Sequence, residues 1–489
     1  MKAQWLWVMM FTGLVHAASG AQAGTIVEHQ GRWLGDMTLP DGKVLKIGVE
    51  LMVRADGSAW ASFASPDQAA YDMPVKGIVE SPHKVDLDLG MATLGLTWSN
   101  DHFEGAYAQN GPPLHFALNK VGDFPRRLLP QAPRAPFPYR ELALAIPAGG
   151  GVVLGATLSM PLDREKPNVV VLVAGSGPVA RDGGVAGHQA FLVMADHLAR
   201  RGIAVLRYDK RGVARSNGNY EQHTVAQLAS DVHAALEALR KSGKFARIGV
   251  VGISEGPGLA AAVGARDPAA LDFVVSLAGV GLNGLELLLL QDRIYARDKG
   301  ATPDEVQRLM PYVRTWYERV LAHADVEPRV AALKALSASL SGADQALVQK
   351  YEMNQGTLSL GWAAQPALRA SLQSDPAPDW RALKVPVLAL HGGLDHQVPA
   401  EENQCAILAA LKAGGNTHVE AARLPSLNHL LQSASSGADD EYFRIEETMA
   451  PAVLRAIAAF VEKQGSLAPS DSARESASSL LCSGWPGHG

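Results

Sequence analysis

The sequence predicts an α/β fold, in which helices cover both faces of a mostly parallel sheet, preceded by a smaller β-rich domain. Two observations lead to this prediction. Before residue 122, short alternating segments are separated by turn residues, whereas after residue 140 continuous apolar runs alternate with amphipathic stretches of helical length. Alternation indicates antiparallel strands with one solvated face, while continuous apolar strands followed by helices are typical of a parallel sheet buried on both faces.

Length and composition exclude several classes of protein. The chain has 489 residues, of which 47% are hydrophobic and 19% charged, and its formal net charge is −5. This length predicts two or three domains, and the hydrophobic content excludes wholesale disorder. The negative charge argues against nucleic acid as a partner. A local basic cluster lies in a proline-rich stretch, which favours a solvated linker over a binding patch; its members are Arg126, Arg127, Arg134 and Arg140.

Residues 1–23 have the pattern of a cleaved signal peptide. Lys2 is followed by an apolar run and then by Ala21-Gln-Ala23, the order of features that export signals share. The run is short for a membrane span, and no later segment reaches about 18 to 20 unbroken apolar residues. We therefore expect a periplasmic or secreted protein without stable membrane insertion.

Residues 24–121 are predicted to form the β-rich domain. They contain eight alternating segments, and Asp41-Gly42 and Asp56-Gly57 are strong hairpin signals. Antiparallel strands this short and numerous are typical of a small barrel or sandwich. Because no reactive side chains converge here, we expect a role in packing or in presenting substrate. A semi-rigid, proline-rich linker is predicted over residues 122–139.

The first part of the α/β unit is predicted over residues 140–280, where a hairpin precedes the alternating strands and helices. Strands are expected at 169–173, 203–207, 247–251 and 273–277, with helices through 191–201 and 225–240. The next hundred residues, 281–380, are helical and rich in Leu, Ala, Arg and Glu. We expect them to form a helical cap above the carboxyl edge of the sheet.

The second part of the α/β unit is predicted over residues 381–463, and a flexible tail over 464–489. The elements expected in this part are a strand at 385–390, a helix at 400–413, a strand near 417–422 and a closing helix at about 442–463. Cys405 lies in the first of these helices and Cys482 in the tail. The two could form a disulfide in an oxidising compartment or remain free packing thiols, and the sequence leaves both possibilities open.

One segment joins an apolar strand to a small-residue helix through Gly252-Ile-Ser254-Glu-Gly256. A serine on a sharp strand-to-helix turn has a strained backbone, and side chains two positions away would collide with the neighbouring strand and helix. The two glycines remove these collisions. Pro257 falls in the first helical turn, where a missing N–H does little harm. The segment therefore predicts a nucleophile elbow with Ser254 as the nucleophile.

A serine nucleophile needs a base to accept its proton and an acid to hold that base in the correct tautomer. Asp395 lies in the loop that leaves one predicted strand, and His429 lies in the loop after the next strand. Loops at the carboxyl ends of neighbouring parallel strands meet at one edge of a sheet. We therefore expect Ser254, Asp395 and His429 to form a catalytic triad, in the order that α/β-hydrolases use.

On these motifs, residues 140–463 resemble an α/β-hydrolase, of the secreted bacterial serine esterase-like kind with an N-terminal β-rich domain. The matches are the elbow, the acid loop Gly393-Leu-Asp395-His-Gln-Val-Pro399 and the pair Asn428-His429. The segment Tyr208-Asp-Lys-Arg-Gly-Val-Ala-Arg-Ser216 is also similar to the family's Asp-x-Arg-Gly-x-Gly-x-Ser turn. It has Ala214 where glycine is usual, a departure that concerns only local turn geometry.

The predicted reaction also needs an oxyanion hole with two N–H donors. One is expected from the backbone of Glu255, whose side chain should face solvent at the helix start. The other is expected from the loop Ala174-Gly-Ser-Gly-Pro178. By resemblance to the family's His-Gly-x loop, Ser176 is the first choice for this donor and Gly177 the second.

Other polar side chains near these motifs are expected to be structural. His391 and His396 flank the acid at positions that suit turn or packing histidines, Asp209 suits a turn, and Asp231 suits a helix surface. The Arg-Asp pair at 181–182 follows the oxyanion loop and is a candidate for substrate contact.

The resemblance implies hydrolysis of a small-molecule carboxylic ester through an acyl-enzyme on Ser254. This reaction needs no metal or organic cofactor. One alternative is a serine peptidase of the same fold, particularly an aminopeptidase, in which cap acids such as Glu286, Glu305 or Glu318 would hold a substrate ammonium. Another is a non-catalytic ligand-binding protein, against which the intact serine, acid and base argue. The acyl group and the oligomeric state do not follow from the sequence.

Overall fold

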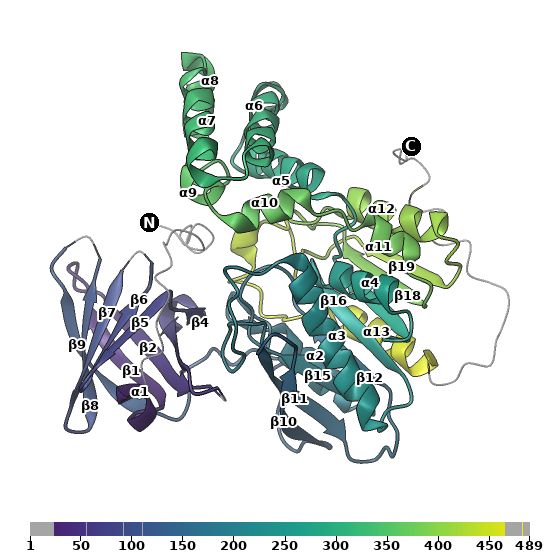
Figure 1. The fold of residues 1–489 in the computed structure, drawn as a ribbon, viewed down its shortest axis with the longest axis horizontal. Coiled ribbons are helices and arrows are strands. Elements are labelled where there is room, and N and C mark those ends of the chain that lie inside the picture. The colour runs from purple at the N-terminus through teal and green to yellow at the C-terminus, as the bar shows by residue number, and fades with distance from the viewer. Residues whose placement is uncertain (1–23, 55, 91, 110, 465–481, 483–489) are drawn as a thin grey trace.

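The computed structural model describes residues 24–464, apart from Ala55, Met91 and Asn110, together with Cys482. The predicted signal peptide and nearly all of the predicted tail lie outside the described residues. Figure 1 shows an N-terminal sheet in purple and blue, a larger α/β unit in teal and yellow-green, and a group of green helices at one end of that unit.

The N-terminal part is a single curled antiparallel sheet preceded by a short helix, α1 (Thr25–Glu28). Its nine strands have the order β4-β3-β2-β1-β9-β8-β7-β6-β5. They are β1 (Gly31–Thr38), β2 (Val44–Val53), β3 (Ala59–Ser65), β4 (Ala70–Pro74), β5 (Gly77–Ser81), β6 (Lys84–Asp88), β7 (Thr93–Ser99), β8 (His102–Ala108) and β9 (Leu114–Val121). Strand β4 was not among the eight predicted segments, because a register shift between Phe63 and Ser65 and a positive φ of 55° at Asp72 interrupt the alternation there.

Aromatic side chains form the centre of the N-terminal sheet's core. Trp33 is buried and packs edge-to-face against Phe103, with ring centroids 4.8 Å apart. The chain then runs without helix or strand from residue 122 to 138. Phe124 anchors this linker to the sheet, because its ring fills the space above Gly48, where a Cβ would lie 2.5 Å from the ring.

The second sheet has eight strands in the order β10-β11-β15-β12-β16-β17-β18-β19. Strands β10 and β11 form the antiparallel hairpin, and the other six strands are parallel. The strands are β10 (Tyr139–Pro147), β11 (Val153–Pro161), β12 (Val169–Val173), β15 (Ala204–Tyr208), β16 (Ile248–Ile253), β17 (Phe273–Leu277), β18 (Val387–Gly392) and β19 (Val419–Leu424). A separate small hairpin joins β13 (Gly184–Val185) to β14 (His188–Gln189). The predicted fold class is confirmed.

Helices cover both faces of this sheet, as predicted. One face packs against α3 (Val225–Ser242), α4 (Gly256–Arg266), α11 (Ala377–Ala382) and α12 (Ala400–Ala413), and the other against α2 (Ala190–Ala199) and α13 (Pro451–Gln464). Successive residues of β12 alternate between the two cores, which explains its unbroken apolar run. Helix α13 begins at Pro451 instead of near residue 442, where a short 3₁₀ turn (Asp439–Glu441) is followed by irregular chain.

The predicted cap is helical and has a core of its own. Its helices are α5 (Gly284–Asp298), α6 (Pro303–Ala322), α7 (Val326–Ala338), α8 (Gly342–Lys350), α9 (Leu360–Ala363) and α10 (Pro366–Gln373). Trp316, Tyr317 and Tyr351 are buried at the centre of the cap. The helices stand at one end of the α/β unit, at the top of Figure 1. None of the helices in the described residues has the length and apolar character needed to cross a bilayer.

The two cysteines are joined by a disulfide, which decides between the alternatives that the sequence left open. Cys405 lies in α12, and the bond to Cys482 ties the end of the chain to this helix across 77 residues of sequence.

Candidate active site

Ser254 occupies the strained turn that the sequence predicted. It follows β16 directly and has a φ of +59°, a conformation that non-glycine residues rarely adopt. Backbone hydrogen bonds hold it there, because its N–H donates to the carbonyl of Leu277 at 2.9 Å and its carbonyl accepts from Val280 at 3.2 Å. In the described part of the chain, nothing forms a hydrogen bond with its hydroxyl.

The two glycines of the elbow are needed for the steric reason inferred from the sequence. A Cβ on Gly252 would lie 2.5 Å from the backbone nitrogen of Pro257, and a Cβ on Gly256 would lie 2.3 Å from the carbonyl oxygen of Val173. Both contacts involve backbone atoms that cannot move aside. Strand β12, the turn and the start of α4 are therefore packed as closely as a nucleophile elbow requires.

The predicted acid and base are in contact and buried. His429 Nδ1 lies 2.8 Å from Asp395 Oδ2, and the other carboxylate oxygen accepts hydrogen bonds from the backbone N–H groups of Gln397 (2.9 Å) and Val398 (2.7 Å). Burial lowers the pKa of His429, but the charge and hydrogen bond of Asp395 outweigh it, so the net pKa lies above the ordinary value for imidazole. Asp395 therefore fixes the orientation of the ring and stabilises its protonated form.

The loops that carry the three residues lie side by side at the carboxyl edge of the sheet. The N–H of Ala278, after β17, donates to Leu390 at 2.8 Å, and the N–H of Leu394, in the acid loop, donates to Leu427 at 2.9 Å. No hydrogen bond joins Ser254 Oγ to the imidazole of His429 within the described residues. In free enzymes such bonds are often long and tighten when substrate binds.

The structure separates the two choices for the oxyanion donor. The N–H of Gly177 donates to Tyr220 Oη at 2.7 Å, so it is already engaged. The N–H groups of Ser176 and Glu255 make no hydrogen bond within the described part of the chain. The loop also lies against the nucleophile, because a Cβ on Gly175 would be 2.8 Å from Ser254 Cβ. Ser176 is thus the better candidate, and Tyr220 is a loop partner that no sequence signal indicated.

The two histidines beside the acid have the structural roles that the sequence suggested. His391 is fully buried and donates its Nε2–H to the carbonyl of Gly279 at 3.1 Å, and burial lowers its pKa to about 4. It is therefore neutral near pH 7. His396 Nδ1 lies 2.9 Å from Asp298 Oδ2 at the end of α5, a contact that joins the acid loop to the cap.

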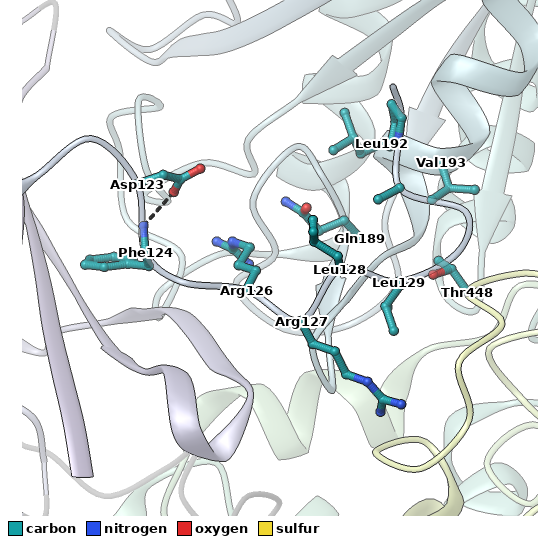
Figure 2. Close-up of a pocket in the computed structure, with 13 residues that line it drawn as sticks. Asp123, Phe124, Arg126, Arg127, Leu128, Leu129, Gln189, Leu192, Val193 and Thr448 are labelled. Atoms are coloured by element: carbon teal, nitrogen blue, oxygen red, sulfur yellow. Dashed lines mark hydrogen bonds between the residues drawn. The ribbon is translucent and has the colours of Figure 1, made fainter. Parts of the chain in front are cut away.

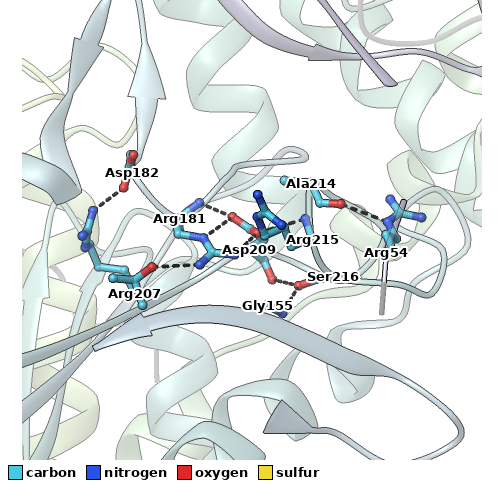
Figure 3. A network of polar contacts seen from close by, with 10 residues as sticks. Arg54, Gly155, Arg181, Asp182, Arg207, Asp209, Ala214, Arg215 and Ser216 are labelled. Atoms are coloured by element: carbon cyan, nitrogen blue, oxygen red, sulfur yellow. Dashed lines mark hydrogen bonds and ion pairs between the residues drawn. The ribbon is translucent and has the colours of Figure 1, made fainter. Parts of the chain in front are cut away.

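The Arg-Asp pair at 181–182 belongs to a polar network and is not free to bind substrate. Arg181 donates to Asp209 from its backbone N–H (2.8 Å) and from its guanidinium (2.5 Å), and Asp182 pairs with Arg207 (Figure 3). Asp209 is buried and also accepts from the backbone of Arg215 at 3.1 Å. The predicted turn role of Asp209 is thus confirmed, and the hydrogen bonds of the network fix the conformation of this turn.

Two sequence-based assignments need correction. Asp231 does not lie on the exposed surface of a helix; it is on the buried face of α3 and forms a two-pronged ion pair with Arg211, at 2.7 and 2.8 Å. The Glu255 side chain faces solvent only in part: it is 27% exposed, and its buried Oε2 lies 3.6 Å from the ammonium of the buried Lys210. In both cases a cation distant from the helix surface, which periodicity alone cannot reveal, draws the carboxylate inward.

The N-terminal sheet contacts the turn that holds this network (Figure 3). Arg54, at the end of β2, donates to the carbonyls of Gly212 and Ala214, each at 2.9 Å. Burial lowers the pKa of Arg54 to about 10. Ala214 has a positive φ of 43°, which explains why glycine is usual at this position in the family turn. No sequence pattern indicated Arg54, because its partners are about 160 residues away.

A cavity of about 240 Å³ lies between the linker and α2 and contains none of the predicted site residues (Figure 2). The arginines at its rim are engaged elsewhere: Arg126 pairs with Asp72 at 3.3 Å, and Arg127 pairs with Glu446. The described residues contain no group of three or more His, Cys, Asp or Glu side chains arranged to hold a metal ion.

The fold and this site define an α/β-hydrolase with a serine elbow. A sequence model of the family described as "Serine aminopeptidase, S33" matches residues 182–433, about half of the chain, and this range includes Ser254, Asp395 and His429. The chain belongs to this family of serine hydrolases. No curated protein matches the sequence.

Several solved structures of esterases and peptidases are similar to the chain. Est1E from Butyrivibrio proteoclasticus, with ferulic acid bound, is 17% identical with a TM-score of 0.40, and the match covers 66% of this chain and 100% of that chain. The Pyrococcus furiosus esterase Pf2001 is 16% identical with a TM-score of 0.41, covering 70% and 96%. Proline iminopeptidase from Mycobacterium smegmatis is 15% identical with a TM-score of 0.40, covering 66% and 99%.

Proposed function

We propose that this protein hydrolyses carboxylic esters through an acyl-enzyme on Ser254. The observation that carries the proposal is the placement of a strained serine at the sheet edge that also holds the buried His429–Asp395 pair and two unengaged amides. A base, an orienting acid and two N–H donors around one hydroxyl are the parts that acyl transfer requires.

In the proposed reaction, Ser254 Oγ attacks the ester carbonyl while His429 Nε2 accepts its proton. Asp395 holds Nδ1–H and stabilises the imidazolium. The developing oxyanion accepts hydrogen bonds from the N–H groups of Ser176 and Glu255. His429 returns the proton to the leaving alkoxide, which departs as an alcohol. Water, deprotonated by His429, then attacks the acyl-enzyme and releases the carboxylic acid and free Ser254.

The second candidate is an aminopeptidase, which the description of the matching family favours. It requires an acidic group to hold the substrate ammonium. Of the cap acids considered, Glu286 pairs with Arg314 at 3.2 Å, Glu305 pairs with Lys350 at 2.7 Å, and Glu318 is exposed on α6. All three acids are thus accounted for as helix-surface charges. Because none of them is needed to hold a substrate ammonium, this supports an ester substrate over a peptide.

The test compares turnover of an aryl butyrate with turnover of amino-acid anilides by the purified protein. We expect turnover of the ester, and a loss of several powers of ten in Ser254→Ala and nearly as much in His429→Ala. A preference for anilides would replace the esterase by the aminopeptidase. A folded wild-type protein that a fluorophosphonate probe does not label would instead favour the non-catalytic binding protein.

We also propose that the protein is exported to the periplasm or the medium. The pattern of residues 1–23 supports this, as does the disulfide between Cys405 and Cys482, since such bonds persist in oxidising compartments. Sequencing the N-terminus of the protein recovered from cell fractions tests it. A start near residue 24 in the periplasmic fraction is expected, and an uncleaved cytoplasmic protein would contradict it.

A further inference from the structure

We propose that Lys210 is a positioning residue that fixes both N–H donors of the oxyanion hole. This inference rests on the proposed function of Ser254 and deepens it. Lys210 is the variable residue of the Asp-x-Arg-Gly turn, and the mechanism described above does not use it. Its ammonium contacts the oxyanion loop on one side and the residue after the nucleophile on the other.

The burial of Lys210 requires an explanation. Its side chain is 3% exposed, and a buried ammonium is costly unless charged or polar partners compensate it. Two partners are present: Lys210 Nζ donates to the carbonyl oxygen of Gly175 at 2.5 Å and lies 3.6 Å from Glu255 Oε2. That carboxylate oxygen is buried and forms no hydrogen bond within the described residues, so the ammonium is the charge that balances it.

The bond to Gly175 determines where the Ser176 amide points. The carbonyl of Gly175 and the N–H of Ser176 belong to one planar peptide unit, which is trans, so the two groups point in opposite directions. Fixing the carbonyl on Lys210 therefore directs the N–H away from it. A cation at the carbonyl oxygen also polarises the unit and makes its N–H a stronger donor. The nucleophile lies beside this unit, since a Cβ on Gly175 would be 2.8 Å from Ser254 Cβ.

Tyr220 fixes the next peptide unit of the same loop. Its Oη accepts the N–H of Gly177 at 2.7 Å, and Lys210 Nζ lies 5.4 Å from the centre of its ring. Two neighbouring peptide units of the loop are thus attached to buried side chains of one segment, residues 210–220. On the other side, the carboxylate paired with Lys210 belongs to Glu255, whose own N–H is the second donor. A single ammonium therefore sets the distance between the two donors.

The experiment measures how Lys210→Met binds a substrate and a transition-state analogue. With an aryl butyrate we expect kcat to fall about 10- to 100-fold, less than the roughly 10²- to 10³-fold that follows removal of an oxyanion donor itself. KM should change less than about threefold, because the donors act mainly on the transition state. The inhibition constant of an aryl trifluoromethyl ketone, which forms an oxyanion adduct with the serine, should rise in proportion to the loss of kcat/KM.

Two further variants separate positioning from a merely structural role. Lys210→Arg keeps the charge and should recover part of the kcat and of the ketone affinity. Lys84→Met changes an exposed lysine of the N-terminal sheet that pairs with Asp86; it is the matched control and should behave as wild type. Wild-type kcat and ketone affinity in a folded Lys210→Met would overturn the inference, as would a loss confined to KM.

The outcomes also distinguish this inference from the proposed function. If Ser254→Ala retains full activity, the proposed function itself fails; if Ser254→Ala is inactive while Lys210→Met is unimpaired, only the inference fails. Should Lys210→Met not fold, Glu255→Gln provides the test, because it removes the charge that pairs with the Lys210 ammonium and keeps the Glu255 backbone N–H and nearly the same packing volume. A rise of about three- to tenfold in the ketone inhibition constant supports the inference, and an unchanged constant overturns it.

Discussion

The two sheets of this protein differ in how deeply their ion pairs are buried. In the nine-stranded sheet, the ion pairs are exposed or partly exposed, from Lys46–Asp36, where the side chains are 41% and 60% exposed, to Arg32–Glu50, where they are 34% and 13% exposed. In the eight-stranded sheet, the pairs Arg211–Asp231 and His429–Asp395 are buried at or near the carboxyl edge. Burying a charged group costs free energy. A concentration of buried charges therefore indicates a functional or structural role at that place in the fold.

The contrast also indicates what each sheet contributes. The curled N-terminal sheet has an aromatic and aliphatic core. Its polar contacts with the α/β unit include Arg54, which donates to the carbonyls of Gly212 and Ala214, and Asp56, which accepts a hydrogen bond from Asn217 at 2.7 Å. The eight-stranded sheet holds Ser254, His429 and Asp395, for which we propose the roles of nucleophile, base and acid. We infer that chemistry is confined to the larger sheet, and that the smaller one acts by supporting the turn at 209–216.

The largest expected effect tests whether the buried pair at the sheet edge is catalytic. Asp395→Asn should lower kcat by about 10⁴-fold with an aryl butyrate, because the amide favours the wrong tautomer of His429. It should also move the acid limb of the pH profile. Neutral His429 is the active form, so activity rises as the pH passes upward through its pKa. Asp395 raises that pKa while burial lowers it, and without the carboxylate the limb should shift to more acidic pH.

The pH profile of kcat/KM for the variant and the wild type provides the measurement. Asp209→Asn is a useful control, because Asp209 is an equally buried carboxylate that contacts arginine and backbone groups instead of a histidine. It should leave the acid limb in place. An Asp395→Asn enzyme with wild-type kcat would show that the buried pair is structural and remove the main difference between the sheets.

The second prediction concerns a buried pair without a catalytic role. Asp231→Ala leaves the guanidinium of Arg211 buried and without its two-pronged partner, and this should cost about 3–5 kcal/mol of unfolding free energy. Urea denaturation followed by circular dichroism measures the loss. The double variant Asp231→Ala/Arg211→Met should recover a large part of it. A single variant as stable as wild type would mean that buried charge in this sheet carries no structural cost.

Local patterns account for what the sequence predicted correctly. The positions of Gly252 and Gly256 on either side of Ser254 describe a turn whose sterics involve only neighbouring residues, so the elbow follows from the sequence. The acid and base are also placed by local rules, because each lies at the end of an apolar strand. The order of the strands then brings Asp395 and His429 to one edge of the sheet.

Contacts between distant segments account for what the sequence missed. Tyr220 holds the oxyanion loop from 43 residues away, and Arg54 reaches the turn from about 160 residues away. Neither residue belongs to a pattern that periodicity can detect. Strand β4 was missed for a related reason: its pairing with β3 depends on a register shift that only the folded sheet defines.

The third prediction tests the contact between the two sheets. Arg54→Ala removes a partly buried guanidinium and its two hydrogen bonds. The carbonyls of Gly212 and Ala214 lose this donor, which should cost about 1–3 kcal/mol. We expect a lower thermal midpoint and a moderate loss of kcat, because the turn at 209–216 loosens. Lys43→Ala, an exposed change in the same sheet, is the control. Wild-type stability and activity in Arg54→Ala would mean that the two sheets are coupled by other contacts.

The smallest expected effect concerns the surface charges of the N-terminal sheet. Asp36→Asn breaks the exposed cross-strand ion pair with Lys46, in which Lys46 Nζ lies 2.8 Å from Asp36 Oδ1. Water solvates both groups when the pair is broken, so exposed pairs of this kind contribute little to stability. We expect no resolvable change in the urea midpoint at physiological salt. Asp36→Asn and Asp231→Ala each remove one carboxylate charge, the first from an exposed pair and the second from a buried one. If both variants lost the same unfolding free energy, burial would not be what distinguishes the ion pairs of the two sheets.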